Sequence, residues 1–511
     1  MHNLKMWLNH LKMKNWLQNE FKTDVPKDII SIIKDEADIV LDDIDSKRVA
    51  LIIHRLSEMP WTTQEQIWKE LDISQGWLNH LNKTIRNNKF FQQLIIKEGL
   101  GRKYWNTMIP YIKNRVNEKV VNHEYQFPLR LALFPGLSCM YFCGFCGRNQ
   151  KARYKGNVTQ EGNQRFKDII SSMPKYSTLS ISGGLEPLTN PGLGEIISHA
   201  KSKGVRVPLI TNAHMLTKKY LDKTPGIWDL DSLRVSLYGT DDESTFFITR
   251  HRKAYNLVKN NIIEFLKLRN EINPNLKLGL NYIIIPENID TILPLLDYIV
   301  DINSQVDGKG IDFLTLREDF GSVTEIDSDV DTSNKKYHLE GLMSDEQREQ
   351  LIGVFKEFNR RKDNECSDMH VDFGYAMVAL GEGILGKPLA RVRGDEMRKS
   401  GYPQMSVAID SLGDVFLYRE AGFLDRPGNS KFIAGRITKD KPLEKVIREF
   451  VDNKISVNRD ETDCRFMDSY DHLMTLLVNQ TESDMNIGIT SPVNIKKDKV
   501  ERQISNNWYK D

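Results

Sequence analysis

Short apolar runs that alternate with helix-like stretches constrain the fold of this chain more than any other feature of its sequence. Six such runs occur, at residues 129–134, 178–182, 206–211, 232–237, 277–285 and 310–316. Strands that alternate with helices form parallel sheets with right-handed crossovers. A closed eight-stranded barrel needs about 250 residues, whereas this region spans about 190. The sequence therefore predicts an α/β fold with an open, partial six-stranded (β/α)6 barrel.

The chain divides into three predicted domains. Residues 1–125 mix charged and apolar side chains at helical spacing, so we expect a helical N-terminal domain. Residues 126–330 contain the six runs and form the barrel. Residues 331–511 contain two strand-like runs separated by Ser411, Leu412 and Gly413, which is a hairpin signal, together with helical stretches. This last region is predicted to be a small C-terminal α+β domain.

Composition and charge exclude several classes of function. The 511 residues include 71 basic and 70 acidic side chains, which leaves a formal net charge of +1. Such a balance provides no broad positive field of the kind that general nucleic-acid binders or polybasic membrane proteins carry. No stretch approaches the roughly 20 apolar residues that span a bilayer, and the N-terminus lacks the apolar run of a signal peptide. We expect a cytoplasmic protein without nucleic-acid or membrane partners.

The cysteines point to a metal centre. Cys139, Cys143 and Cys146 lie within eight residues, directly after the first predicted strand. Three thiolates can bind three irons of a [4Fe–4S] cluster, which leaves the fourth iron open. A structural zinc site is the weaker alternative, because it normally takes four ligands at paired short spacings and the remaining Cys366 and Cys464 stand alone. We interpret these last two cysteines as core residues.

The order of the motifs resembles the radical S-adenosylmethionine (SAM) superfamily. The three cysteines have the spacing Cys-x3-Cys-x2-Cys, with Phe145 before the third. After the second predicted strand, the segment 182–187 reads Ser-Gly-Gly-Leu-Glu-Pro, which is similar to the Gly-Gly-Glu-Pro motif of that superfamily with one residue inserted. The resemblance implies a radical SAM barrel with a [4Fe–4S] cluster and SAM as cofactors.

The resemblance also assigns roles to individual residues. It makes Cys139, Cys143 and Cys146 the cluster ligands and hence catalytic residues. Glycines let the backbone approach a bound amino acid, a carboxylate suits an ammonium group, and a guanidinium binds a carboxylate in bidentate fashion. Arg252 fits the last role nearly as well as Arg250. The SAM-binding candidates are Gly183, Gly184, Glu186, Asn212, Ser236, Tyr238 and Arg250.

Longer segments resemble the radical SAM deaminases of deoxysugar biosynthesis, the TDP-4-amino-4,6-dideoxy-D-glucose ammonia-lyases. This resemblance implies that a 5′-deoxyadenosyl radical abstracts hydrogen from carbon 3 of the sugar, which then loses ammonia to give a TDP-3-keto-4,6-dideoxy sugar. It also implies an electron donor such as a flavodoxin or ferredoxin. The C-terminal region is similar to auxiliary-cluster domains without their cysteines. The segments that carry the resemblance are 104–107, 151–154, 182–194, 236–239, 316–319, 370–376, 417–423 and 433–436.

A nucleotide sugar needs cations for its diphosphate and acceptors for its hydroxyl and ammonium groups. Arginines and acidic residues follow the cysteines or lie at predicted strand ends. The substrate-binding candidates are Arg153, Arg317, Glu318, Tyr418, Arg419 and Glu420.

Three other functions remain compatible with the sequence. One is a radical SAM dehydrogenase or dehydratase that acts on a related nucleotide sugar. Another is a non-enzymatic iron–sulfur or zinc protein, such as a redox sensor, in which the segment 182–187 is only a turn. A third, peptide maturation, is weakened by the absence of cysteines for auxiliary clusters.

Overall fold

The computed structural model divides the chain into two compact units, residues 1–102 with 393–396 and residues 103–392 with 397–511. In the first unit the described residues are few, and Val49, Ile52 and Leu78 among them are helical and fully buried. The second unit carries the fold and the site described below. The described residues are 46, 48, 49, 52, 74–76, 78, 79, 108, 110–143, 146, 154, 158–318, 343–374, 377–381, 399–423, 428–458, 467 and 469–486.

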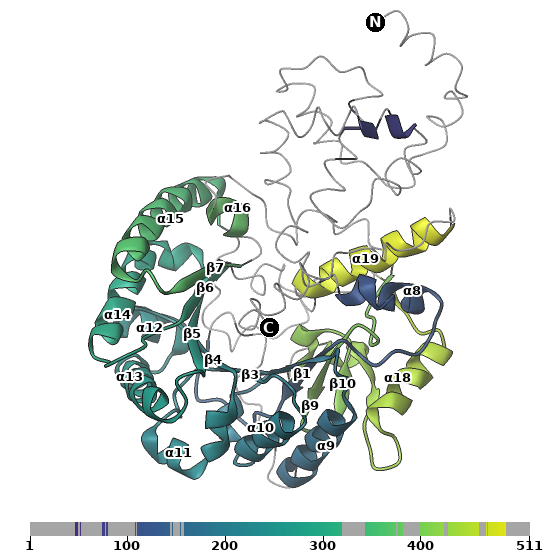
Figure 1. Cartoon of the computed structure of the whole chain (residues 1–511), viewed down its shortest axis with the longest axis horizontal. Coiled ribbons are helices and arrows are strands. Elements are labelled where there is room, and N and C mark those ends of the chain that lie inside the picture. The colour runs from purple at the N-terminus through teal and green to yellow at the C-terminus, as the bar shows by residue number, and fades with distance from the viewer. Residues whose placement is uncertain are drawn as a thin grey trace, which may run out of the picture. The chain divides into compact units, whose positions relative to one another are not determined.

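All six predicted runs overlap a strand of one sheet. Adjacent strands in the series β1 to β6 pair in parallel, as the alternation with helices predicted. Helices lie along the outer side of this curved row of strands (Figure 1). The bounds are β1 Arg130–Phe134, β2 Thr178–Ile181, β3 Pro208–Thr211, β4 Ser232–Leu237, β5 Lys277–Ile284 and β6 Phe313–Glu318.

The sheet continues at both edges beyond the six predicted strands. In the described part of the chain it has ten strands, in the order β11-β10-β9-β1-β2-β3-β4-β5-β6-β7. Strand β7 (His370–Phe373) pairs in parallel with β6, and β9 (Ser406–Asp410) pairs in parallel with β1. Strands β10 (Asp414–Phe416) and β11 (Ile433–Arg436) are antiparallel, which makes the sheet mixed. The predicted hairpin at residues 411–413 joins β9 to β10.

The domain layout therefore differs from the sequence prediction. Strands β7, β9, β10 and β11 do not form a separate sheet, because they cover the two open edges of the barrel strands. Only the short strand β8 (Lys399–Ser400) pairs elsewhere in the described residues, with β12 (Val457–Asn458) in a two-stranded antiparallel sheet. At the other boundary, helix α8 (Val116–Val121) belongs to the second unit and not to a separate domain 1–125. The side chain of Asn117 in α8 donates to Thr481 Oγ1 of α19 (Ser469–Asn486) at 2.7 Å.

The two faces of the sheet differ in chemistry. Successive side chains of a strand point to opposite faces, and Leu278, Leu280 and Leu314 belong to the apolar core under the helices. The opposite face, which we call the inner face, carries polar side chains such as Asn281 and Thr315. Parallel strands are usually apolar on both faces, so a polar inner face indicates a binding site. The helices are α9 Val158–Ser172, α10 Leu193–Ser202, α11 Lys218–Lys223, α12 Asp242–Thr249, α13 Ala254–Ile272, α14 Ile292–Ser304, α15 Asp345–Glu365, α16 Val378–Gly381 and α18 Leu443–Asp452.

One buried ion pair fixes β6 beside β5. The fully buried Arg269 of α13 donates to Asp312 Oδ2 at 2.7 Å, and Lys277 contacts the other oxygen of the same carboxylate at 3.0 Å. The backbone N–H of Leu278 also donates to Asp312 at 2.9 Å. Removing one partner would leave an uncompensated buried charge, which costs about 3–5 kcal/mol.

Among the described helices, none is long and apolar enough to cross a membrane.

A second buried carboxylate joins the hairpin to the segment that follows the cysteines. Asp410 accepts from the Tyr154 hydroxyl at 2.6 Å and from the backbone N–H groups of Leu412 and Asp414 at 3.0 and 2.9 Å. Burial raises the pKa of Asp410 to about 6. The charged form of this carboxyl group is therefore disfavoured in the folded protein relative to the unfolded chain.

We predict that Asp410→Asn gains stability relative to the wild type as the pH rises. The pKa of an unfolded aspartate is about 3.9, whereas that of the folded Asp410 is about 6. The stabilisation that the protonated carboxyl group gives the folded state is therefore fully present below about pH 3.9 and is lost as the pH rises through about 6. Between pH 5 and pH 7.5, the free energy of unfolding of the wild type should fall by about 1 kcal/mol relative to the variant. Urea unfolding at both pH values measures this difference, and a difference that does not change with pH contradicts it.

Candidate active site

The cysteine loop lies at the carboxyl ends of the parallel strands, where α/β folds place their chemistry. It follows β1 and is held by backbone hydrogen bonds on two sides. The N–H of Glu186 donates to Ser138 O at 2.9 Å, and the N–H of Phe142 donates to Thr249 O at 3.0 Å. The loop is therefore tied both to the turn after β2 and to the end of α12.

The three predicted cluster cysteines share one environment. Cys139, Cys143 and Cys146 are partly exposed thiols that form no disulfide bond among the described residues. Desolvation raises the pKa of Tyr238 well above its usual range, and the charges of all three thiolates act on the phenol in the same direction. The Nδ2 atom of Asn212 lies 3.6 Å from Cys139 Sγ. The three thiols thus lie near Tyr238, and Cys139 also lies near Asn212.

This arrangement fits an iron–sulfur cluster. In the described residues, no three His, Cys, Asp or Glu side chains converge on the position of a single metal ion. A [4Fe–4S] cluster does not require such convergence, because each thiolate binds a different iron. Cys366 lies outside this group, buried in the apolar core at the end of α15, as predicted. Cys464 lies outside the described residues.

Close backbone contacts require Gly183 and Gly184 in the turn that follows β2, which we call the glycine turn. A Cβ atom at Gly183 would lie 2.3 Å from Leu185 O, and one at Gly184 would lie 2.4 Å from Gly422 O. Gly422 ends the short 3-10 helix η7 (Arg419–Gly422). Gly184 is therefore the point at which this C-terminal segment contacts the turn after β2. The guanidinium of Arg419 donates to Ser182 Oγ at 2.8 Å across the same contact. Two motifs more than 200 residues apart in the sequence thereby meet.

Glu186 has protein partners on both carboxylate oxygens. Its Oε1 accepts from Thr211 Oγ1 at 2.5 Å and from the N–H of Leu188 at 3.1 Å, while Oε2 accepts from the N–H of Asn212 at 2.8 Å. Burial raises the pKa of Glu186, and these hydrogen bonds oppose that shift. A carboxylate offers about four acceptor positions, so three of them are already used here. The side chain joins the end of β3 to the turn after β2.

An aromatic group beside the cysteine loop was not foreseen from the sequence. The ring centroid of Tyr141 lies 5.3 Å from that of His214, 5.9 Å from that of Tyr238 and 5.7 Å from that of His251. The Tyr141 hydroxyl lies 3.1 Å from His214 Nδ1, and desolvation lowers the pKa of His214. The position of His214, two residues after Asn212 at the end of β3, was the signal available in the sequence.

The two arginine candidates for SAM differ in their surroundings. Arg250 is half-buried at the C-terminal end of α12, where its φ of 58° is left-handed, and its guanidinium lies 5.2 Å from the Phe247 ring. Arg252 is exposed and lies over Phe246. Ser236 is half-buried on the inner face of β4.

The substrate candidates do not form one group. Arg419 and the half-buried Glu420 lie on η7 beside Ser182. Tyr418, directly before η7, is instead buried, and its hydroxyl lies 2.5 Å from Ser400 Oγ. Arg317 is exposed on β6. Arg153 and the side chain of Glu318 lie outside the described residues.

Known proteins resemble this chain in sequence and in fold. Residues 133–299 match the Radical SAM superfamily. The chain is 36% identical over 392 residues to the dTDP-4-amino-4,6-dideoxy-D-glucose ammonia-lyase of Streptomyces venezuelae, which covers 76% of this chain and 78% of that protein. It is 33% identical over 107 residues to the AdoMet-dependent heme synthase of Methanosarcina barkeri (strain Fusaro), which covers 21% of this chain and 30% of that one.

Among solved structures, SuiB of Streptococcus suis bound to its precursor peptide SuiA is similar, with a TM-score of 0.41 and 15% identity over 65% of this chain and 68% of that one. The chain belongs to the radical SAM superfamily, in the family of the dTDP-4-amino-4,6-dideoxy-D-glucose ammonia-lyase.

Proposed function

We propose that the chain is a radical SAM ammonia-lyase that acts on TDP-4-amino-4,6-dideoxy-D-glucose. The single observation that carries this proposal is the 36% identity over 76% of the chain to the Streptomyces venezuelae enzyme of that name. The identity extends far beyond the 133–299 core that the superfamily shares. The likeness is therefore to this particular enzyme and not only to the superfamily.

The proposed reaction is a deamination that consumes SAM. When bound, the [4Fe–4S] cluster and SAM supply a 5′-deoxyadenosyl radical, which takes a hydrogen atom from carbon 3 of the sugar. The carbon 3 radical loses ammonia from carbon 4, and uptake of one electron and one proton then gives the TDP-3-keto-4,6-dideoxy sugar. The electrons come from a donor such as a flavodoxin or ferredoxin, so we place the enzyme in the cytoplasm.

The residues of the site are assigned to two groups, the iron–sulfur cluster and SAM. We assign Cys139, Cys143 and Cys146 to the cluster, since they are three partly exposed thiols of one loop at the strand ends. We assign Gly183 and Gly184 to SAM binding because they form the turn beside this loop, while their lack of side chains is required by close backbone contacts within the protein. Asn212, Ser236, Tyr238 and Arg250 offer polar groups to the same ligand. Glu186 supports this site chiefly by fixing Asn212.

The diphosphate requires cations, and two described arginines are available to supply them. Arg419 lies against the turn after β2, and Arg317 lies at the carboxyl end of β6. Both are near strand ends, so a nucleotide could lie across the edge of the sheet between them. Glu420, next to Arg419, is an acceptor for ribose or sugar hydroxyls.

We predict that the anaerobically reconstituted protein, given reductant, SAM and TDP-4-amino-4,6-dideoxy-D-glucose, releases ammonia and 5′-deoxyadenosine in a 1:1 ratio. Cys139→Ala, Cys143→Ala and Cys146→Ala should each lower ammonia release at least about 1000-fold, because each removes a thiolate from an iron. Cys366→Ala, in the apolar core, is the control and should keep its activity. Formation of a keto sugar without ammonia would identify a dehydrogenase instead.

We predict that Arg419→Ala raises KM for the sugar nucleotide about 10- to 100-fold, because it removes a charge-assisted contact to the diphosphate. Arg419→Lys should recover part of this loss, since it keeps the charge but not the bidentate geometry. Arg448→Ala, which removes an exposed arginine paired with Glu444 on α18, is the matched control. Steady-state kinetics of ammonia release measure KM, and an unchanged value for Arg419→Ala rules out its assignment.

A further inference from the structure

A row of polar side chains crosses the inner face of the sheet at one level. Ser236 of β4 is the cross-strand partner of Asn281 in β5, Asn281 is the partner of Thr315 in β6, and Thr315 is the partner of Asp372 in β7. Neighbouring strands are about 4.8 Å apart, so the three side chains from β5 to β7 extend over about 10 Å. Three polar groups are thus presented together by three rigid strands.

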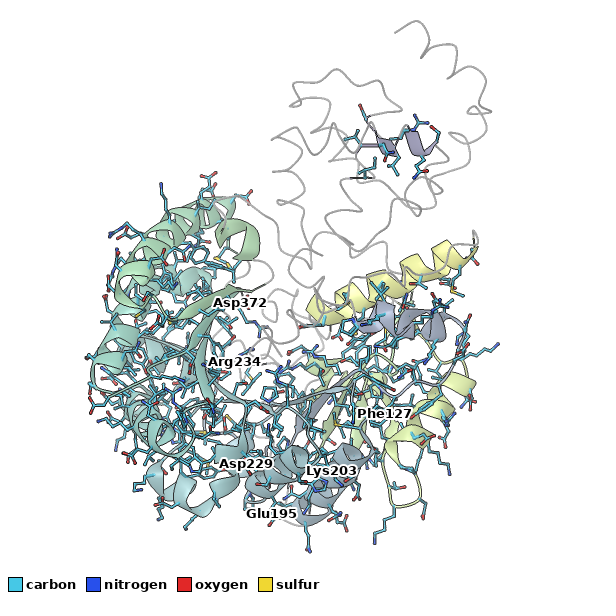
Figure 2. The ribbon with its side chains drawn as sticks, in the orientation of Figure 1. Phe127, Glu195, Lys203, Asp229, Arg234 and Asp372 are labelled. Atoms are coloured by element: carbon cyan, nitrogen blue, oxygen red, sulfur yellow. The ribbon has the colours of Figure 1, made fainter. Side chains whose placement is uncertain are left out.

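The alternation of side chains sets the direction of this row. Leu280 and Tyr282 flank Asn281, and Leu314 and Leu316 flank Thr315; all four belong to the apolar core under the helices. Asn281 and Thr315 therefore point away from the helices, to the inner face. In Figure 2, Asp372 and Arg234 both lie along the inner side of the curved row of strands.

Two members of the row are buried without a hydrogen-bond partner. Asn281 is 6% exposed and Thr315 is 5% exposed, and in the described part of the chain neither Asn281 Oδ1 nor Thr315 Oγ1 has a partner. Asp372 beside them is 9% exposed. Buried polar atoms are nearly always hydrogen-bonded in folded proteins, so two neighbouring exceptions on adjacent strands indicate a ligand that supplies the missing bonds.

The level below this row is filled by side chains. Gly279 lies two residues before Asn281, and a Cβ atom there would lie 2.2 Å from the Phe313 ring. The guanidinium of Arg234 lies 5.7 Å from the centre of the same ring. Phe313 and Arg234 therefore occupy the space under the row. We therefore expect a ligand to reach the row from the carboxyl ends of the strands.

The level above the row carries a cation. Arg317 lies two residues after Thr315, which places it about 6.6 Å nearer the carboxyl end of β6 on the same face. Its cross-strand neighbour Gly374 has no side chain, and a Cβ atom there would lie 2.9 Å from Arg317 Cα. From the closed end outward, the order is therefore aromatic ring, hydrogen-bonding row and exposed guanidinium.

We infer that Asn281, Thr315 and Asp372 bind the 4-amino-4,6-dideoxy sugar ring, with the Asp372 carboxylate accepting from the ammonium on carbon 4. Asn281 Oδ1 and Thr315 Oγ1 take the adjacent hydroxyl groups, and Arg317 reaches the diphosphate one level outward. This inference rests on the proposed function and adds the residues that select an amino sugar. A row made of oxygen acceptors suits a cation and hydroxyl donors together.

The test compares two ligands that differ only at carbon 4. One is TDP-4-amino-4,6-dideoxy-D-glucose, and the other is TDP-6-deoxy-D-glucose, which carries a hydroxyl group there. Asp372→Asn should raise KM for the amino sugar about 10- to 100-fold and change the Kd of the hydroxyl analogue less than about 3-fold, because a single charge-assisted contact is lost. Asp368→Asn, an exposed carboxylate just before β7, is the matched control and should change neither value.

A second variant separates binding from folding. Thr315→Val keeps the shape of the side chain and removes an unpartnered hydroxyl, so the thermal midpoint of the free protein should stay the same or rise. The same variant should raise KM for the amino sugar about 5-fold, as expected for one lost hydrogen bond. A lower thermal midpoint with unchanged KM would show a structural role and overturn the inference.

The outcomes also distinguish this inference from the proposed function. If the wild type releases ammonia from the amino sugar and Asp372→Asn keeps both its KM and its preference over the hydroxyl analogue, the row does not bind the sugar. If the wild type neither binds nor turns over the amino sugar, the proposed function itself is wrong and the inference fails with it.

Discussion

The carboxylate of Glu186 is the interaction on which the rest of the site depends. Its side chain accepts from Thr211 and Asn212 at the end of β3, and its backbone N–H donates to Ser138 at the start of the cysteine loop. One residue thus connects the ends of β1, β2 and β3. Because the carboxylate is buried, each of these bonds forms in a low dielectric, where a hydrogen bond is electrostatically stronger than in water. The cysteine loop and Asn212 are held at a fixed relative position as a result.

The glycine turn is the second constraint, and it acts between distant parts of the chain. Gly184 has no room for a side chain because the backbone of Gly422 lies against it, and Arg419 reaches Ser182 across the same contact. The C-terminal strands therefore do more than cover an edge of the sheet. They place η7 at the carboxyl end of β2, beside the residues that we assign to SAM and to the diphosphate of the substrate.

Much of the fold followed from the sequence. The six apolar runs predicted β1 to β6 and their parallel pairing, because each strand is followed by an amphipathic helix that must return to the same edge. The turn at Ser411–Gly413 predicted the hairpin of β9 and β10. The partners of β7 and β9 were not predictable, since the pattern of a strand does not say which open edge it will pair with. For the same reason the predicted boundary near residue 330 does not separate β7, β9, β10 and β11 from the sheet of the barrel strands.

By itself, the sequence determined the chemistry: three thiols in one loop, a glycine turn followed by a glutamate, and arginines for an anionic substrate. These are local patterns, and their spacing along the chain carries the information. The tertiary structure decided which polar residues act together. It turned Tyr418 into the core, brought His214 to Tyr141, and aligned Asn281, Thr315 and Asp372 across three strands. Strand register brings Asn281, Thr315 and Asp372 together over gaps of 34 and 57 residues, and His214 lies 73 residues from Tyr141, so no local pattern could reveal these contacts.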